Sequence, residues 1–205
     1  MARFGEAANS FNNPDLHKKF GANAAVGAAG ERHYATALDR GGISSKYEVH
    51  SSLNIPNSSR SRTSYSSDVD IAVANGNTLI LIDVKRFAAG FHYWSFFGFP
   101  FKNLTPMLKD GKGDDGPKWR LSANMAAAVD RYQQALPGVH VEAMVAFVPT
   151  NSKGAMPASV GLLFWPGGIR SFLAGDSIYR LNKLLGTPTP VNPAIRSLLA
   201  RMTRP

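Results

Sequence analysis

The chain has 205 residues, with 23 Lys and Arg against 14 Asp and Glu, so its formal net charge is +9. This length suits one domain with a sizeable core. Hydrophobic residues make up 44% of the chain and charged residues 18%, which argues against a disordered protein and against a coiled coil. The chain has no cysteine, which excludes a disulfide scaffold, a zinc ribbon, an iron–sulfur cluster and a thiol nucleophile.

The beginning of the sequence, MARFGEAANSFNN, lacks the basic segment and apolar stretch of a secretory signal. No run of about 18 apolar residues occurs anywhere in it. We therefore expect a cytoplasmic protein with no membrane partner. The excess of positive charge favours polyanions, of which nucleic acid is the commonest.

The order of the predicted elements indicates a single α/β domain with a mixed central β-sheet flanked by helices. We expect an irregular N-terminal arm at 1–21, the α/β domain at 22–186, and a linker with a basic amphipathic C-terminal helix at 187–205. Within these segments the predicted elements are helices at 22–40, 121–136, 177–185 and 194–202, and strands at 46–55, 69–74, 78–84, 139–149 and 159–165. A turn after 166–168 is expected to lead into 169–173.

The segment SDVDIAVANGNTLILIDVKRF, residues 67–87, predicts a β-hairpin, because Asn-Gly-Asn punctuation separates two β-rich runs. A turn at Gly76–Asn77 places Asp70 opposite Asp83, whereas a turn one residue earlier places Asp68 there. Either register brings a carboxylate across from Asp83, at a Cβ separation of about 4.5–5.5 Å.

Strand alternation places Asp83 and Lys85 on one face. Two ionised carboxylates so close repel each other unless one keeps a proton or a cation lies between them. Mg²⁺ suits such a site, because it prefers oxygen ligands and keeps several waters, so that two carboxylates and a substrate phosphate suffice. A neighbouring lysine can orient or deprotonate a water and offset transition-state charge. In the structural alternative, the aspartates are polar residues at a strand start and Lys85 only pairs with Asp83.

The first predicted helix carries a core-facing stripe at the spacing i, i+3, i+4, i+7, formed by Glu31, Tyr34, Ala35 and Leu38. A glutamate at an inward position needs a partner. A metal site is one candidate, and pairing with Arg or Lys is the structural alternative.

Three stretches together resemble the PD-(D/E)XK nuclease superfamily, and most of all its nuclease-related branch called NERD. They are Gly30-Glu31 leading an apolar helix, Asp70-Ile-Ala-Val, and Ile82-Asp83-Val84-Lys85. The resemblance covers roughly residues 24–185. It implies a restriction-endonuclease-like αβββαβ core.

By that resemblance, Asp70 and Asp83 would bind Mg²⁺ or Mn²⁺, and Val84 would offer its backbone carbonyl to the metal. Lys85 would be the catalytic lysine, and Glu31 would complete the acidic set. The sequence departs from the family in two ways. Asp83 stands where NERD sequences more often have Glu. The helix after the lysine often has Gln near its start, whereas here the inward polar residue is expected to be Asn124.

Basic and aromatic segments supply candidate contacts to DNA and to protein. The residues expected to contact DNA are Arg60, Arg62, Arg86, Arg120 and Asn124. The aromatic segment 87–101 could stack on bases, but few cations accompany its rings, so we favour a core lid or a partner-binding surface. The amphipathic C-terminal helix could dock on the body, on a partner or on DNA.

Two functions from different classes follow from these patterns. The first is a Mg²⁺-dependent deoxyribonuclease in which Glu31, Asp70, Asp83 and Lys85 act at the phosphodiester bond. The second is a non-catalytic protein on the same scaffold that contacts DNA or serves in assembly.

Overall fold

The computed structural model describes residues 3–7, 22–57, 68–87, 92–94, 107–109, 118–120, 122–149 and 164–204. Its helices are α2 (Ala22–Arg40), α3 (Ile43–Lys46), α4 (Asn124–Ala135), α5 (Ala174–Leu185) and α6 (Pro193–Met202). The strands of the main sheet, in spatial order, are β1 (Arg3–Phe4), β2 (Glu48–Asn54), β3 (Asp68–Asn75), β4 (Thr78–Phe87), β8 (His140–Pro149), β10 (Ile169–Leu173) and β9 (Phe164–Trp165). A second sheet contains β5 (His92–Trp94), β6 (Met107–Lys109) and β7 (Lys118–Arg120).

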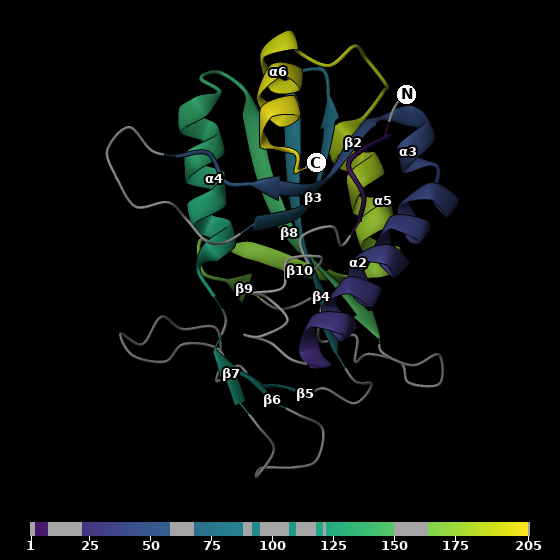
Figure 1. Ribbon diagram of the computed structural model, residues 1–205, viewed down its shortest axis with the longest axis vertical. Coiled ribbons are helices and arrows are strands. Elements are labelled where there is room, and N and C mark those ends of the chain that lie inside the picture. Colours follow the sequence, from purple (N-terminus) through teal and green to yellow (C-terminus); the bar gives the residue numbers. More distant parts are fainter. Residues whose placement is uncertain are drawn as a thin grey trace.

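The main sheet is mixed, which confirms the predicted fold class. Strands β2, β3 and β4 form an antiparallel meander, whereas β8 runs parallel to β4, and β10 runs parallel to β8. Helices lie on both faces, with α2, α3 and α5 on one side and α4 and α6 on the other (Figure 1). The αβββαβ order expected from the sequence is present as α2, β2–β4, α4 and β8.

The β3–β4 hairpin has the first of the two registers considered from the sequence. Asn75 pairs with Thr78 and Ile71 pairs with Ile82, so the turn consists of Gly76 and Asn77. Gly76 has a φ of 53°, a conformation that glycine adopts without the steric cost of a side chain. This register brings Asp70 to the level of Asp83.

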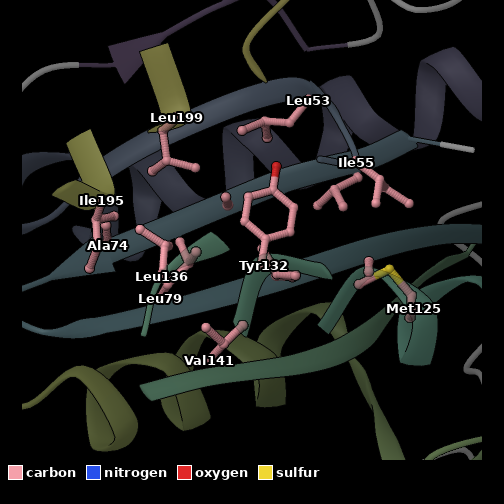
Figure 2. Close-up of a cluster of buried hydrophobic side chains, with 14 of the residues drawn as sticks. Leu53, Ile55, Ala74, Leu79, Met125, Tyr132, Leu136, Val141, Ile195 and Leu199 are labelled. Carbon is pink, nitrogen blue, oxygen red and sulfur yellow. The ribbon is translucent and has the colours of Figure 1, made fainter. Parts of the chain in front are cut away.

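Each face of the sheet has its own core. The core under α4 and α6, which we call the α4 core, includes Tyr132, Leu136, Ile195 and Leu199 packed on the sheet (Figure 2). Fully burying a side chain of this size stabilises the fold by about 1.5–3 kcal/mol. The apolar side of α6 is thus buried within the chain.

The opposite core, which we call the α2 core, joins helices α2 and α5 to the other face of the sheet. Tyr34 and Leu38 of α2 are buried there against Ile80 and Ile82 of β4. The Tyr34 hydroxyl lies 2.7 Å from the Ser177 hydroxyl of α5, which satisfies the polar end of a buried ring. The inward stripe predicted for the first helix is therefore confirmed.

The outer edge of β2 is covered by two short segments. Residues 3 and 4 form strand β1, in which Phe4 pairs with His50 in parallel register. The prediction of an irregular arm was wrong for these two residues, because an edge strand offers unpaired backbone groups that a short segment can bind. Further along the same edge, Thr203 bridges to Leu53. Most of the predicted arm lies outside the described residues.

The segment between α5 and α6 is fixed to the hairpin by Asn75. The amide nitrogen of Asn75 donates to the carbonyls of Leu185 and Thr187, at 2.7 and 2.8 Å. Its oxygen accepts the backbone N–H of Thr189 at 2.7 Å. Asn192 then caps α6 by accepting the N–H of Ala194 at 2.8 Å. These contacts hold the predicted linker against the end of the sheet.

A buried polar cluster joins β2 to α6. His50 is 1% exposed, and its ring nitrogens lie 3.1 Å from Glu48 Oε1 and 3.0 Å from Thr203 Oγ1. Arg196 donates to Glu48 Oε2 at 3.0 Å. Burial lowers the pKa of His50, and the attraction of Glu48 offsets this only in part. The hydrogen bonds from Arg196 and His50 outweigh burial at Glu48 and lower its pKa.

We expect acidification from pH 7.5 to 5.5 to reduce the free energy of unfolding partly through His50. The unfolded imidazole takes up a proton near pH 6.5, whereas the folded one resists protonation, so the stability from His50 is present above this value and is lost as the pH falls. Glu48 loses its contribution only at lower pH. Urea unfolding at several pH values should show that the free energy of unfolding changes less with pH in His50→Gln than in the wild type. His140→Gln, at an exposed histidine, is the control, and an unchanged pH dependence in His50→Gln would contradict the assignment.

Candidate metal and catalytic site

The candidate site forms where β3 and β4 part. Their paired residues end at Ile71 and Ile82, and strand alternation makes the amide of Val84 the next N–H of β4 that points toward β3. This amide donates not to a backbone carbonyl but to the Asp70 carboxylate, at 2.5 Å from Oδ2. The side chain of Asp70 thus takes the place of a backbone carbonyl as the acceptor between the two strands.

Strand β3 rotates at Asp70. Val69 packs in the α4 core and Ile71 in the α2 core, although residues two apart in a regular strand share a face. On the neighbouring strand, Ser52 lies between the paired residues of β2 and has a φ of 56°, which is strained for a residue other than glycine. The irregular backbone at this level directs the Asp70 carboxylate to the edge of β4.

Asp83 and Lys85 lie on one face of β4, as alternation predicts. The Lys85 ammonium group donates to Asp83 Oδ1 at 2.8 Å. The side chain of Asp83 is 13% exposed and that of Lys85 is 34% exposed. The pair is therefore next to solvent but is not a freely hydrated surface ion pair.

Helix α2 brings Glu31 to the same region. Glu31 is 2% exposed, which confirms its inward position. The preceding residue, Gly30, packs on the half-buried side chain of Arg86, and a Cβ at Gly30 would lie 2.8 Å from the Arg86 Cβ. The absence of a side chain at Gly30 lets the helix lie close to the end of β4, where Glu31 acts on the charge of Asp70.

Electrostatics couple the predicted residues to Asp70 from the two faces of the sheet. Glu31 acts from the face of the α2 core, whereas Asp83 and Lys85 alternate with Ile82 and Val84 and lie on the face of the α4 core. Burial raises the pKa of Asp70 well above its usual value, and the charges of Glu31 and Asp83 raise it further against the opposing attraction of Lys85. We call Glu31, Asp70 and Asp83 the acid cluster. Burial lowers the pKa of Lys85, but the charges of Asp83 and Asp70 outweigh burial and raise it. Lys85 is thus an ammonium ion at neutral pH and donates to Asp83.

The oxygens of Asp70, Asp83 and the Val84 carbonyl are of the type that a hard divalent cation prefers. Carboxylate and carbonyl oxygens suit Mg²⁺ or Mn²⁺. The N–H and C=O of one residue in an extended strand point to the same side, so the carbonyl of Val84 is directed toward the parting of the strands, as is its N–H. Across the part of the chain that the structure describes, no three His, Asp or Glu side chains are arranged to hold a metal ion. A metal would therefore rely on Asp70, Asp83 and the Val84 carbonyl, with water or phosphate completing its shell.

The other predicted contact residues fall in different places. Arg86 lies beside Gly30, next to the acid cluster. Asn124 is exposed as the first residue of α4, so the expectation that it points inward was wrong, because the inward stripe of this helix consists of Met125, Ala128 and Tyr132. Arg120 belongs to β7, but its side chain lies outside the described part. Arg60, Arg62 and most of the aromatic segment 87–101 also lie outside it.

Sequence reasoning missed one residue at the edge of this site. Arg204 donates through Nη1 to Asp68 Oδ2 at 3.2 Å. Asp68 in turn adds to the negative potential at Asp70 and at Lys85. Asp68 and Arg204 are 136 residues apart in the chain, so no local sequence pattern predicts their contact.

Comparison with known proteins gives no relative from which a role could be transferred: no family model, no curated protein and no solved structure matches the chain. Among the described helices, none is long and apolar enough to cross a membrane.

We expect Asp70→Asn to stabilise the metal-free protein at pH 8. The amide oxygen still accepts the Val84 N–H, while the repulsion by Glu31 and Asp83 is removed. Since a raised carboxyl pKa means that ionisation destabilises the fold, stability is lost as the pH rises toward the folded-state pKa. The gain should be on the order of 1 kcal/mol in urea unfolding.

Asp83→Asn serves as the comparison, because it also removes a carboxylate but loses the ion pair with Lys85. It should gain less stability than Asp70→Asn. A lower stability of Asp70→Asn than of the wild type at pH 8 would show that the acid cluster is not under electrostatic strain.

Proposed function

We propose that the protein is a metal-dependent nuclease that hydrolyses phosphodiester bonds in DNA. The observation that carries this proposal is that the half-buried Asp70 and Asp83 lie with Lys85 at the parting of β3 and β4, while the buried Glu31 acts on Asp70 from α2. Strands rarely bury Asp and Lys together without a functional reason. The net charge of +9 supports a polyanionic substrate.

In this proposal the acid cluster holds a cation and Lys85 stabilises negative charge. Asp70 and Asp83 would hold Mg²⁺ or Mn²⁺ together with the Val84 carbonyl, and the Val84 N–H fixes the orientation of Asp70. When bound, such an ion supplies Lewis-acid stabilisation of a phosphoryl oxygen and a more acidic water. Glu31 adds the negative charge that favours a cation over an ammonium group alone.

Lys85 acts as a cationic donor. In the free protein its ammonium group is held by Asp83, and about a third of the side chain faces solvent. With Asp83 engaged in holding a cation, the ammonium group of Lys85 would be able to donate to a non-bridging phosphate oxygen or to orient the attacking water. It then stabilises the negative charge that develops at phosphorus.

One observation favours the second function, a DNA-contacting or assembly protein without catalysis. Lys85 already neutralises Asp83 at 2.8 Å, so this pair is satisfied without a metal. A scaffold that has lost hydrolysis could keep such an ion pair for stability alone. The experiment below separates the two functions.

We expect the wild type to nick supercoiled plasmid in Mg²⁺ or Mn²⁺ and to lose this activity in EDTA. Asp83→Asn and Lys85→Met should each cut at least 100-fold more slowly, because they remove a ligand and a transition-state donor. Initial rates are read from the conversion of supercoiled to relaxed DNA on a gel. Glu142→Gln and Lys183→Gln are charge-matched controls on β8 and α5, outside the site, and should cut like the wild type.

Equal cutting by the wild type and the two site variants, or cutting that persists in EDTA, would remove the enzymatic claim. DNA binding in a gel-shift assay without any cutting would support the non-catalytic alternative.

A further inference from the structure

The guanidinium group of Arg204 bridges the last residue pair of strands β2 and β3. Asn54 and Asp68 are register partners at the end of this ladder. Arg204 donates through Nε to Asn54 Oδ1 at 2.9 Å and through Nη1 to Asp68 Oδ2 at 3.2 Å. One planar side chain thus contacts both members of the pair, which is the geometry that arginine provides and lysine does not.

The segment that carries Arg204 is itself fixed to β2. Its backbone N–H donates to the Ser52 carbonyl at 3.0 Å, and the adjacent Thr203 bridges to Leu53. The Thr203 hydroxyl donates back to Leu199 of α6 at 2.8 Å. The guanidinium group is therefore anchored by a helix packed in the α4 core, although its own side chain is 28% exposed.

Asp68, one end of this bridge, precedes Asp70 by two residues in β3. The Ser52 carbonyl that holds Arg204 belongs to the strained residue opposite Asp70, and Asp68 starts the strand that delivers Asp70 to Val84. Asp68 is also a competing carboxylate, since its charge acts on both Asp70 and Lys85. Arg204 gives that carboxylate a counter-ion of its own, so that Lys85 stays with Asp83.

We propose that Arg204 is a positioning residue of the acid cluster. By joining Asn54 to Asp68 it holds the start of β3 in register, keeps the Asp70 carboxylate on the Val84 amide, and keeps Asp68 away from Lys85. The consequence for catalysis rests on the proposed function. The effect on Asp70 is a property of the fold and is measurable without metal or DNA.

The first test is amide hydrogen exchange in the metal-free protein, read by NMR. Arg204→Gln should raise the exchange rate of the Val84 amide about tenfold, because the acceptor for this N–H is no longer held in place. The amide of Ile80, in the middle of β4, should exchange as in the wild type and shows that the fold persists. Arg201→Gln, at an exposed arginine on the last turn of α6, is the control and should leave Val84 unchanged.

The second test is the kinetics of DNA cutting. Arg204→Gln should lower kcat at least tenfold and change KM less than threefold, since it disturbs the acid cluster and not the binding of DNA. Asp68→Asn should also lower kcat, and the double variant should be no slower than Arg204→Gln alone, because the two residues act as one unit. Arg204→Lys, which cannot bridge both partners, should recover only part of the rate.

The outcomes separate the two proposals. An unchanged Val84 exchange rate in Arg204→Gln overturns the positioning role. A raised KM with an unchanged kcat also overturns it, and assigns Arg204 to DNA backbone binding. Faster exchange at Val84 in a protein whose wild type never cuts DNA supports the positioning role and rejects the proposed nuclease.

Discussion

The bond from the Val84 amide to the Asp70 carboxylate is the contact on which the candidate site depends. Where two antiparallel strands part, an amide of the longer strand loses its carbonyl partner, and a buried unpaired N–H costs about 1–3 kcal/mol. Asp70 supplies a carboxyl oxygen as the acceptor instead. The sheet can therefore open at this point without leaving an amide unpaired, and the same bond fixes a carboxylate in the opening.

A second constraint is the balance of charge around that carboxylate. Glu31 and Asp83 act on Asp70 from a helix and from the adjacent strand, and burial weakens the screening that water would provide. Lys85 compensates from within the cluster, and Arg204 compensates at its edge through Asp68. Lys85 thus offsets only part of the effect of burial and negative charge on Asp70, whose pKa stays raised in the metal-free protein. A divalent cation bound there would offset more of this charge, which is one argument for the metal-dependent reaction that we propose.

Much of this site could be predicted because it follows from local periodicities. The Asn-Gly-Asn turn predicted a hairpin with two possible registers, of which the structure has the first. Alternation placed Asp83 beside Lys85, and helical spacing turned Glu31 inward. The bond from Val84 to Asp70 could not be predicted, because it needs β3 to rotate at a level where Ser52 has a positive φ, and no sequence pattern marks that position. Strand β1 was missed for a related reason: its two residues gain their structure only from the edge of β2.

The strained Ser52 has a consequence beyond the site. It divides β2 so that Val49 packs in the α2 core while Leu53 packs in the α4 core. Strand β2 thus belongs to both the α2 core and the α4 core. Neither core can come apart while the other keeps its packing on β2. The helices on the two faces should consequently melt in one cooperative transition.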